Sequence, residues 1–278
     1  MTVSVKAMPA LLFCPADRPD RYQKALDRAD GVILDLEDAV LQDAKSQARE
    51  AIIASDLPSS RVIVRINSPE TGDFRADLAA VLQTKYRTIM VAKSESCDDI
   101  ANIPSSFKVI ALCETAKGVK EAEKIAELDN VIGLMWGAED LIASMGGTSS
   151  RFSNGKYRDV ARHARSRVLL AARAVRKTAI DAVHINIKDL DGLKEEASDA
   201  AASGFQATAC IHPSQVDTIR EAYMPNQEQI EQAKALLNAA QGQRGVFSFQ
   251  NQMVDEPVLR HARSILARAR RMEERSMR

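Results

Sequence analysis

Eight short apolar runs recur along the chain, and their alternation with helical patterns constrains the fold more than any other feature. The runs lie at 10–14, 31–36, 62–66, 88–92, 109–113, 131–136, 182–187 and 207–211. Short apolar runs bounded by turn residues are typical of buried strands, and strands that alternate with helices are typical of parallel βα units. No Gly-x-Gly-x-x-Gly follows the first run. The pattern therefore favours an α/β fold of the (β/α)8 TIM barrel type over an open dinucleotide-binding sheet.

Helices are expected between the runs, at 19–29, 43–55, 73–84, 97–103, 116–127, 157–178, 189–202 and 214–222. The pattern at 97–103 is the weakest of these. After Pro225 the chain changes to a polar helix that reaches about Ala240, a Gly- and Gln-rich joint, and a basic helix from Pro257. We therefore expect residues 1–225 to form a barrel that carries the chemistry, and residues 226–278 to form a C-terminal helical extension.

Composition limits the kinds of partner. Lys+Arg 38 equals Asp+Glu 38, so the formal net charge is zero, and no long-range field favours nucleic acid or an anionic membrane. The apolar start at 8–14 is too short to span a bilayer. The four cysteines form no Cys-x-x-Cys pair, as expected of free thiols in a reducing cytoplasm. A cytoplasmic protein with a small-molecule substrate is the expectation.

Two adjacent apolar runs stop on acids. Glu114 directly follows the run at 109–113. A Gly-Ala pair separates the run at 131–136 from Glu139 and Asp140. Neighbouring parallel strands that end in this way would hold two carboxylates over one cleft, where barrel enzymes place their chemistry. Mg²⁺ is commonly held by one or two carboxylates, waters and substrate oxygens. The alternative is that these acids only begin loops or cap helices.

Charged residues also follow nearly all of the remaining apolar runs. Several of the segments around these strand ends together resemble a known family. The matching segments are LFCPADRPDR (12–21), GVILDLEDAV (31–40), VRIN (64–67), AKSES (92–96), ALCETAKGV (111–119), GLMWGAEDL (133–141), CIHPSQV (210–216) and QMVDEPVLRHAR (252–263). In this order they resemble the citrate lyase beta-subunit-like branch of the HpcH/HpaI aldolase family. The resemblance covers almost the whole chain.

The resemblance implies a Mg²⁺-dependent carbon-carbon lyase. Such an enzyme cleaves, or forms, a 3-hydroxyacyl thioester of coenzyme A, of the citryl, malyl or citramalyl type, giving an acetyl-type thioester and a 2-oxo acid. By motif match Glu114 and Asp140 would bind the metal, while Glu139 would support the turn, although its neighbouring position leaves the assignment open. Two alternatives remain: a metal-dependent aldolase acting on free 2-oxo acid aldols, or a non-catalytic subunit of a larger lyase complex.

Other residues receive roles in the same way. Arg65 would bind a carboxylate or enolate oxygen with its planar N–H groups, or form a surface ion pair. Arg18 would contact the thioester or a phosphate, or pair with Asp17 or Asp38. Glu37 is placed near the water shell of the metal or the thioester, with a catalytic role. Asp35 and Asp38 either orient Arg18 or cap the next helix. Gly137 and Ala138 would line the substrate site.

Asp255 is the candidate for proton transfer, because cleavage needs a base for the hydroxyl proton and an acid for the enolate carbon. In related lyases an acid of this motif reaches into a neighbouring subunit, so we expect the extension to pack on a neighbour in a homotrimer or homohexamer. Alternatively, Asp255 only caps the helix that begins near Pro257.

The chain departs from the family pattern at three places. Many relatives have Asp-Gly-Lys where this chain has Phe249 to Gln252, and Gly-Lys where it has Ala207 to Ala209; an acid often found after the seventh strand is here Asn186. These departures concern the expected contacts with the thioester carrier, so the sequence does not decide whether coenzyme A is that carrier.

Two further residues at strand ends could suggest other chemistry. His212 follows a strand-like run without a second His or Cys at ligand spacing, which favours a hydrogen bond to the strand end over metal ligation. Lys93 could form a Schiff base at a barrel rim. The acidic pair argues for metal chemistry instead.

Overall fold

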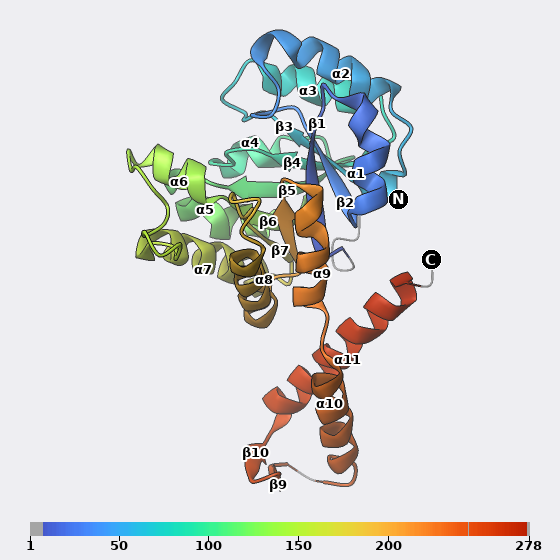
Figure 1. Ribbon diagram of the computed structural model, residues 1–278. Helices are drawn as coiled ribbons and strands as arrows, with labels where there is room; N and C mark the ends of the chain where they lie inside the picture. Colours follow the sequence, from blue (N-terminus) through green and yellow to red (C-terminus); the bar gives the residue numbers. More distant parts are fainter. Residues whose placement is uncertain (1–7, 244, 277–278) are drawn as a thin grey trace. The chain divides into compact units, whose positions relative to one another are not determined.

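The computed structural model describes residues 8–243 and 245–276, and eight parallel strands within them close into a barrel in chain order (Figure 1). The strands are β1 (Ala10–Pro15), β2 (Gly31–Asp35), β3 (Val62–Ile66), β4 (Thr88–Val91), β5 (Lys108–Cys113), β6 (Val131–Trp136), β7 (Thr178–Asp181) and β8 (Ala207–Cys210). The barrel closes where β1 pairs with β8, through registers such as Leu12 with Cys210. The predicted (β/α)8 barrel is confirmed.

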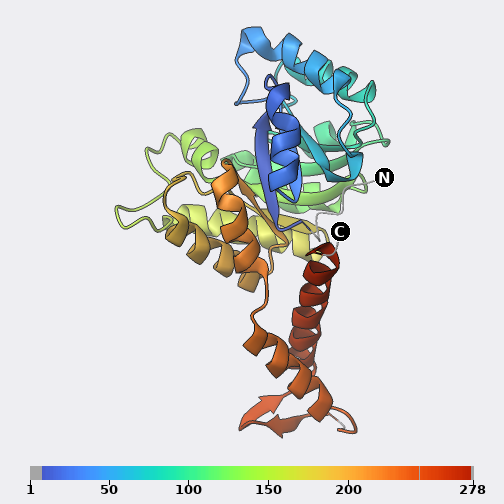
Figure 2. The ribbon, with the colours of Figure 1, turned by 45° about the vertical axis from the view of Figure 1, so that its right-hand side comes forward.

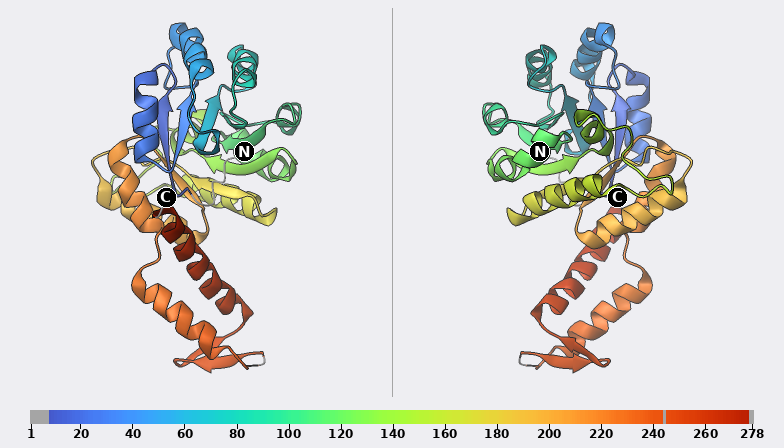
Figure 3. Two further views of the ribbon diagram at one scale, coloured as in Figure 1. Left: turned by 90° about the vertical axis from the view of Figure 1, so that its right-hand side faces the viewer. Right: turned by 90° about the vertical axis from the view of Figure 1, so that its left-hand side faces the viewer.

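Helices surround this barrel, as the two views of Figure 3 show. They are α1 (Tyr22–Arg28), α2 (Lys45–Ala54), α3 (Asp73–Leu82), α4 (Cys97–Ala101), α5 (Ala116–Glu127), α6 (Ala138–Ser144), α7 (Asp159–Ala174), α8 (Leu190–Ser203) and α9 (Val216–Tyr223). The short α6 was not predicted, because its first turn carries the acids that were assigned to a strand end. Within the described residues, no helix is long and apolar enough to cross a membrane.

The barrel interior is filled by buried aliphatic side chains. They come from all eight strands and include Leu11, Ile33, Ile63, Met90, Ile110, Leu112, Met135, Ile180, Ala207 and Ala209. Burial of this apolar surface is the main source of stability in such a domain. All four cysteines are free, and three of them, Cys14, Cys113 and Cys210, are buried. The prediction of unpaired thiols is therefore confirmed.

The seventh strand differs from its prediction. It occupies Thr178–Asp181, whereas the apolar run at 182–187 was expected to form it. The side chains of Ile185 and Ile187 are 48% and 38% exposed, so this apolar run belongs to the loop after the strand. Helix α7 ends early enough to allow this, because Arg176 adopts a left-handed backbone with φ 59°. The residue at the end of β7 is consequently Asp181, and Asn186 lies further along the loop.

Residues from Glu221 onward form a second compact unit, and residues up to Arg220 form the first. The second unit contains α10 (Gln227–Ala239), the antiparallel strands β9 (Phe247–Phe249) and β10 (Gln252–Val254), and α11 (Glu256–Ser276). Helices α10 and α11 pack together in it (Figure 2). The hairpin was not predicted. The expected boundary at residue 225 stays a prediction.

Candidate functional site

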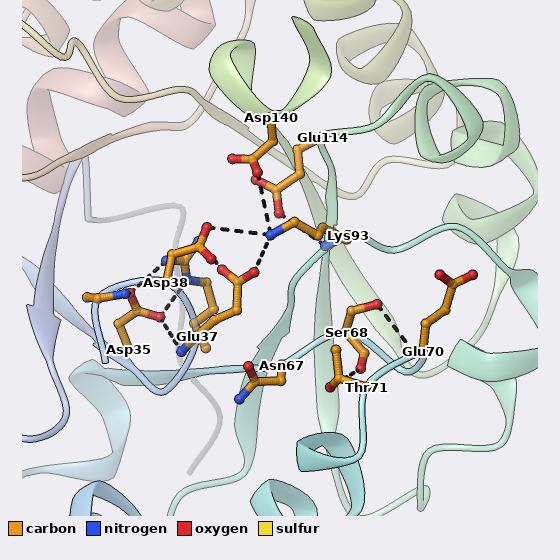
Figure 4. A network of polar contacts seen from close by, with 12 residues as sticks. Asp35, Glu37, Asp38, Asn67, Ser68, Glu70, Thr71, Lys93, Glu114 and Asp140 are labelled. Atoms are coloured by element: carbon orange, nitrogen blue, oxygen red, sulfur yellow. Dashed lines mark hydrogen bonds and ion pairs between the residues drawn. The ribbon is translucent and has the colours of Figure 1, made fainter. Parts of the chain in front are cut away.

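The two predicted acids follow neighbouring strands. Glu114 comes directly after β5 and Asp140 lies in the first turn of α6, which follows β6; these strands pair in parallel, with Cys113 opposite Trp136. Glu114 is 3% exposed, and 35% of the Asp140 side chain is exposed. Figure 4 shows the two carboxylates side by side. The structure therefore brings the predicted pair together at the carboxyl ends of the strands.

The lack of a side chain at Gly137 allows the start of α6 to lie against Glu114. A Cβ atom on Gly137 would lie 2.8 Å from Oε2 and 2.9 Å from Cβ of Glu114, distances that real Cβ atoms do not tolerate. The residue also stands at the N-cap of α6, and Ala138, the first residue of the helix, is 5% exposed. Gly137 thus packs against a predicted metal ligand.

Lys93 occupies the centre of the acidic cluster. Its backbone N–H donates to Oε1 of Glu114 at 3.1 Å, and its ammonium donates to Oε1 of Glu37. The same ammonium lies 3.4 Å from an oxygen of Asp38 and 3.4 Å from Oδ1 of Asp140 (Figure 4). The side chain of Lys93 thus forms ion pairs in this cluster.

Arg65 is held by a buried carboxylate. Its Nε and Nη2 donate to the two oxygens of Asp35, each at 2.6 Å, and its Nη1 lies 3.0 Å from Oε2 of Glu37. The central carbon of its guanidinium lies over the Phe13 ring, 4.9 Å from the ring centre. Burial, the largest single influence, opposes the charge, but Asp35 together with Glu37 and Glu114 outweighs it and holds the pKa of Arg65 above its ordinary range. Asp35 therefore orients Arg65, whereas the sequence suggested Arg18 as its partner.

Glu37 is buried between two cations. Only 6% of it is exposed, and its Oε2 forms no hydrogen bond of acceptable geometry within the described residues. Burial raises its pKa above the usual range, while Arg65 and Lys93 act in the opposite direction. Nη1 of Arg65 balances the charge of Oε2 at 3.0 Å, and the oxygen still has room to accept a hydrogen bond from a ligand. Glu37 is therefore suited to contact a bound molecule.

The electrostatics of Glu114 fit a divalent cation. Burial, followed by the nearby charge of Asp140, raises the pKa of Glu114 to about 8. Two carboxylates that repel each other in this way are stabilised by a positive ion between them. Within the described residues, no cluster of three or more His, Cys, Asp or Glu side chains is arranged to hold a metal. A pair of carboxylates completed by water and substrate is the pattern that suits Mg²⁺.

A second layer holds the turn that carries Glu37. The buried ammonium of Lys45 donates to the backbone carbonyls of Leu36 and Glu37 at 2.7 and 3.1 Å, and to Oδ1 of Asn67 at 2.9 Å. Nδ2 of Asn67 in turn donates to Asp77 at 2.6 Å. Sequence reasoning missed Lys45, because an isolated lysine on a helix gives no signal of burial.

Several predicted residues lie outside this cluster. Arg18 is 55% exposed on its side chain, and its Nε lies 4.0 Å from Asp17, in agreement with the alternative ion pair. Oε1 of Glu139 accepts a hydrogen bond from Ser150 at 2.7 Å, so this acid has a partner outside the pair. His212 accepts a hydrogen bond from the backbone N–H of Ser214 and caps a short helical turn.

Asp255 lies in the second unit, at the start of α11. Its Oδ1 accepts a hydrogen bond from the backbone N–H of Val258 at 3.3 Å. The alternative role of Asp255, as the N-cap of this helix, is therefore present. A role in proton transfer stays a prediction.

A buried histidine was missed because it falls in the misassigned seventh run. His184 is 5% exposed, with Nδ1 2.8 Å from Glu196 and Nε2 3.2 Å from Asp189. Its carbonyl accepts a hydrogen bond from Gln215 at 2.8 Å. His184 therefore ties the loop after β7 to α8 and to the turn that follows β8.

Residues 10–213 match the HpcH/HpaI aldolase/citrate lyase family. The chain belongs to this family. It is 52% identical over 263 residues to a citrate lyase subunit beta-like protein of Mycobacterium tuberculosis, covering 95% of this chain and 96% of that protein. It is 31% identical over 299 residues to the mitochondrial citramalyl-CoA lyase of Rattus norvegicus, covering 96% and 87%.

A solved structure of this family agrees with the barrel. The crystal structure of CitE from Mycobacterium tuberculosis, in complex with magnesium, acetoacetate and coenzyme A, matches with a TM-score of 0.92 and 51% sequence identity. The match covers 95% of this chain and 99% of that chain. The resemblance inferred from the sequence motifs is therefore confirmed.

Proposed function

We propose that this protein is a Mg²⁺-dependent carbon-carbon lyase of the HpcH/HpaI family. It cleaves, or forms, a 3-hydroxyacyl-coenzyme A of the citryl, malyl or citramalyl type, with an acetyl-type thioester and a 2-oxo acid as the other reactants. The observation that carries this proposal is the approach of Glu114 and Asp140 beside Arg65 and Glu37. The related CitE, whose crystal holds magnesium, acetoacetate and coenzyme A, supports it.

Glu114 and Asp140 would hold the metal ion. When bound, the ion supplies Lewis-acid polarisation of the oxo-acid carbonyl, an effect of several kcal/mol on such reactions. Gly137 keeps the space beside Glu114 that this arrangement needs. With Ala138, it forms the N-terminal edge of α6 and would line the substrate site.

Arg65 would stabilise negative charge that develops on the reacting oxygen. Asp35 occupies its Nε and Nη2, so the guanidinium is fixed before substrate binds. Fixed donors cost no reorganisation when charge develops, which is why they favour the transition state. Its Nη1, beside Glu37, is the group that would meet the substrate.

Cleavage requires one proton to leave the 3-hydroxyl group as the carbon-carbon bond breaks, and one proton to reach the carbon of the resulting thioester enolate. We assign the proton transfer to Asp255, with Glu37 as a second catalytic carboxylate at the metal site. Burial raises the pKa of Glu37 above its ordinary value, which favours the protonated form that an acid-base group needs in part of its cycle. Arg18, exposed before the first helical turn, would contact the thioester carrier.

The assembly and location belong to the same proposal. A homotrimer or homohexamer would let the C-terminal unit of one subunit deliver Asp255 to a neighbour. Free thiols at all four cysteines suit a cytoplasmic location, because a reducing compartment keeps thiols unpaired. The substrates are small molecules, and neither nucleic acid nor a membrane is expected as a partner.

A panel of malyl-, citramalyl-, citryl- and 3-hydroxy-3-methylglutaryl-coenzyme A tests the proposal directly. The purified protein is assayed with Mg²⁺ and with a chelator, and release of the carbonyl product is followed. Metal-dependent cleavage of one citryl, malyl or citramalyl thioester is the expected result. Turnover of the free acids without coenzyme A would replace the proposal by a free-acid aldolase. If pure protein cleaves none of them, a non-catalytic subunit becomes the better account.

A further inference from the structure

Lys93 contacts both members of the proposed metal pair. Its backbone N–H donates to Oε1 of Glu114 at 3.1 Å, and its Nζ lies 3.4 Å from Oδ1 of Asp140. Each contact uses one oxygen of its carboxylate. A single residue thus links the two proposed metal ligands.

The backbone of this lysine is held firmly. Its φ of 46° lies in the left-handed region, which side-chain-bearing residues seldom adopt. The next residue, Ser94, donates its N–H to Leu112 of β5 at 2.9 Å and its hydroxyl to Val91 at 2.9 Å. Gly118 allows the turn to approach α5, because a Cβ there would lie 2.6 Å from the carbonyl oxygen of Ser94. These contacts fix the base of the Lys93 side chain beside Glu114.

The ammonium of Lys93 brings positive charge to the part of the cluster that includes Asp140. Arg65 uses two donors on Asp35 and approaches Glu37 with Nη1, whereas Lys93 pairs with Glu37 and also lies 3.4 Å from Asp38 and 3.4 Å from Asp140. Only 31% of its side chain is exposed. In Figure 4 the ammonium points between these three carboxylates. A divalent ion bound by Asp140 would meet this charge at short range.

We propose that Lys93 is the resident counter-ion of the metal site. In the metal-free protein its ammonium holds Asp140 close to Glu37, and a divalent ion binds Asp140 by displacing it. Lys93 therefore lowers the affinity for the free metal and keeps the carboxylates assembled until the metal arrives. This inference rests on the proposed assignment of Glu114 and Asp140 as metal ligands.

Titration calorimetry with Mg²⁺ alone tests the inference without any substrate. Lys93→Met removes the charge and keeps most of the side-chain volume. The matched control is Lys85→Met, which removes a lysine that pairs with Asp56 at the surface. Removal of a cation a few ångströms from a ligand should tighten Mg²⁺ binding about tenfold after allowance for solvent screening. The control should stay within about twofold of the unmodified protein.

The outcomes separate the two proposals. Unchanged or weaker Mg²⁺ binding by Lys93→Met would overturn the counter-ion role and leave the metal pair intact. No Mg²⁺ binding by either the unmodified protein or the variant would overturn the metal pair itself, and the inference with it. Lys93→Gln, which is polar and uncharged, serves if the Met variant does not fold.

Crystals of the unmodified protein provide a measurement that needs no variant. We expect Nζ of Lys93 to move beyond ion-pairing distance of Asp140, from its present 3.4 Å, when Mg²⁺ is soaked into metal-free crystals, while its contact with Glu37 remains. An ammonium that stays against Asp140 with the metal bound would contradict displacement.

Discussion

Glu114→Gln should remove a large part of the pH dependence of stability in the metal-free protein. Burial and the charge of Asp140 raise the pKa of Glu114 from 4.5 to about 8 in the folded state. As the pH rises above about 4.5, the unfolded chain releases this proton while the folded chain keeps it. The free energy of unfolding therefore falls through this window and levels off above about pH 8. Glutamine cannot ionise, so the variant lacks this component.

The raised pKa of Glu114 sets the size of this change in the free energy of unfolding. A full pH unit inside the window changes the unfolding free energy by about 1.4 kcal/mol, so this carboxyl accounts for a loss of about 2–3 kcal/mol between pH 5 and pH 7. Because Gln retains an oxygen that can accept the N–H of Lys93, the substitution leaves the hydrogen bond at 3.1 Å possible.

Urea unfolding at pH 5 and pH 7, with a chelator present, measures this difference. The unmodified protein should lose about 2–3 kcal/mol more than Glu114→Gln over the interval. Glu139→Gln, an exposed acid on the same rim, is the control and should follow the unmodified protein. An equal pH dependence in the unmodified protein and in Glu114→Gln would refute the assignment of a raised pKa to this buried carboxyl.

Two further substitutions test the geometry of the site and the proton transfer. Gly137→Ala places a Cβ 2.8 Å from Oε2 of Glu114, so we expect a loss of about 1–3 kcal/mol of stability in urea unfolding and weaker Mg²⁺ binding by calorimetry; normal values for both would contradict the close approach. Asp255→Asn should lower turnover about 10²- to 10⁴-fold with little change in KM, because proton transfer is lost while substrate binding is kept. Near-normal turnover in steady-state kinetics would leave Asp255 as a helix cap alone.

The sequence predicted the barrel well where a strand is an unbroken apolar run with an acid at its end. The runs that end before Glu114 and at Trp136 became β5 and β6, and the pairing of these strands brings the two acids together. The seventh strand could not be placed in the same way. The run at 182–187 is as apolar as a strand, yet Ile185 is 48% exposed in a loop. A local pattern does not reveal which apolar run the closed sheet will bury.

The sequence predicted which residues lie in the site, but it did not predict the contacts between them. Arg65 and Glu37 were singled out, but the partners that position them were not. The bidentate pair of Arg65 with Asp35 joins neighbouring strands, and the contacts of Lys45 with the Glu37 turn come from a helix. Such contacts depend on the three-dimensional register of the barrel. They have no periodic signature along the chain.

Lys93 shows the same limit. The sequence placed it at a strand end and weighed it only as a Schiff-base lysine. Its left-handed backbone and its ion pairs with Glu37 and Asp140 became visible only in the folded chain. A lysine that pairs with carboxylates keeps its proton, and its pKa is held above the ordinary range despite burial. This environment disfavours the neutral amine that a Schiff base requires.

Metal binding by Asp140→Asn is the measurement that tests the central claim most directly. The Asp140 side chain is 35% exposed at the rim, so the variant should fold, as its circular dichroism and unfolding curve can show. The account predicts that calorimetry finds Mg²⁺ binding to the unmodified protein and a loss of at least tenfold in affinity in Asp140→Asn, together with loss of metal-dependent thioester cleavage; a tenfold loss corresponds to about 1.4 kcal/mol. Unchanged Mg²⁺ affinity in a folded Asp140→Asn protein would contradict the account.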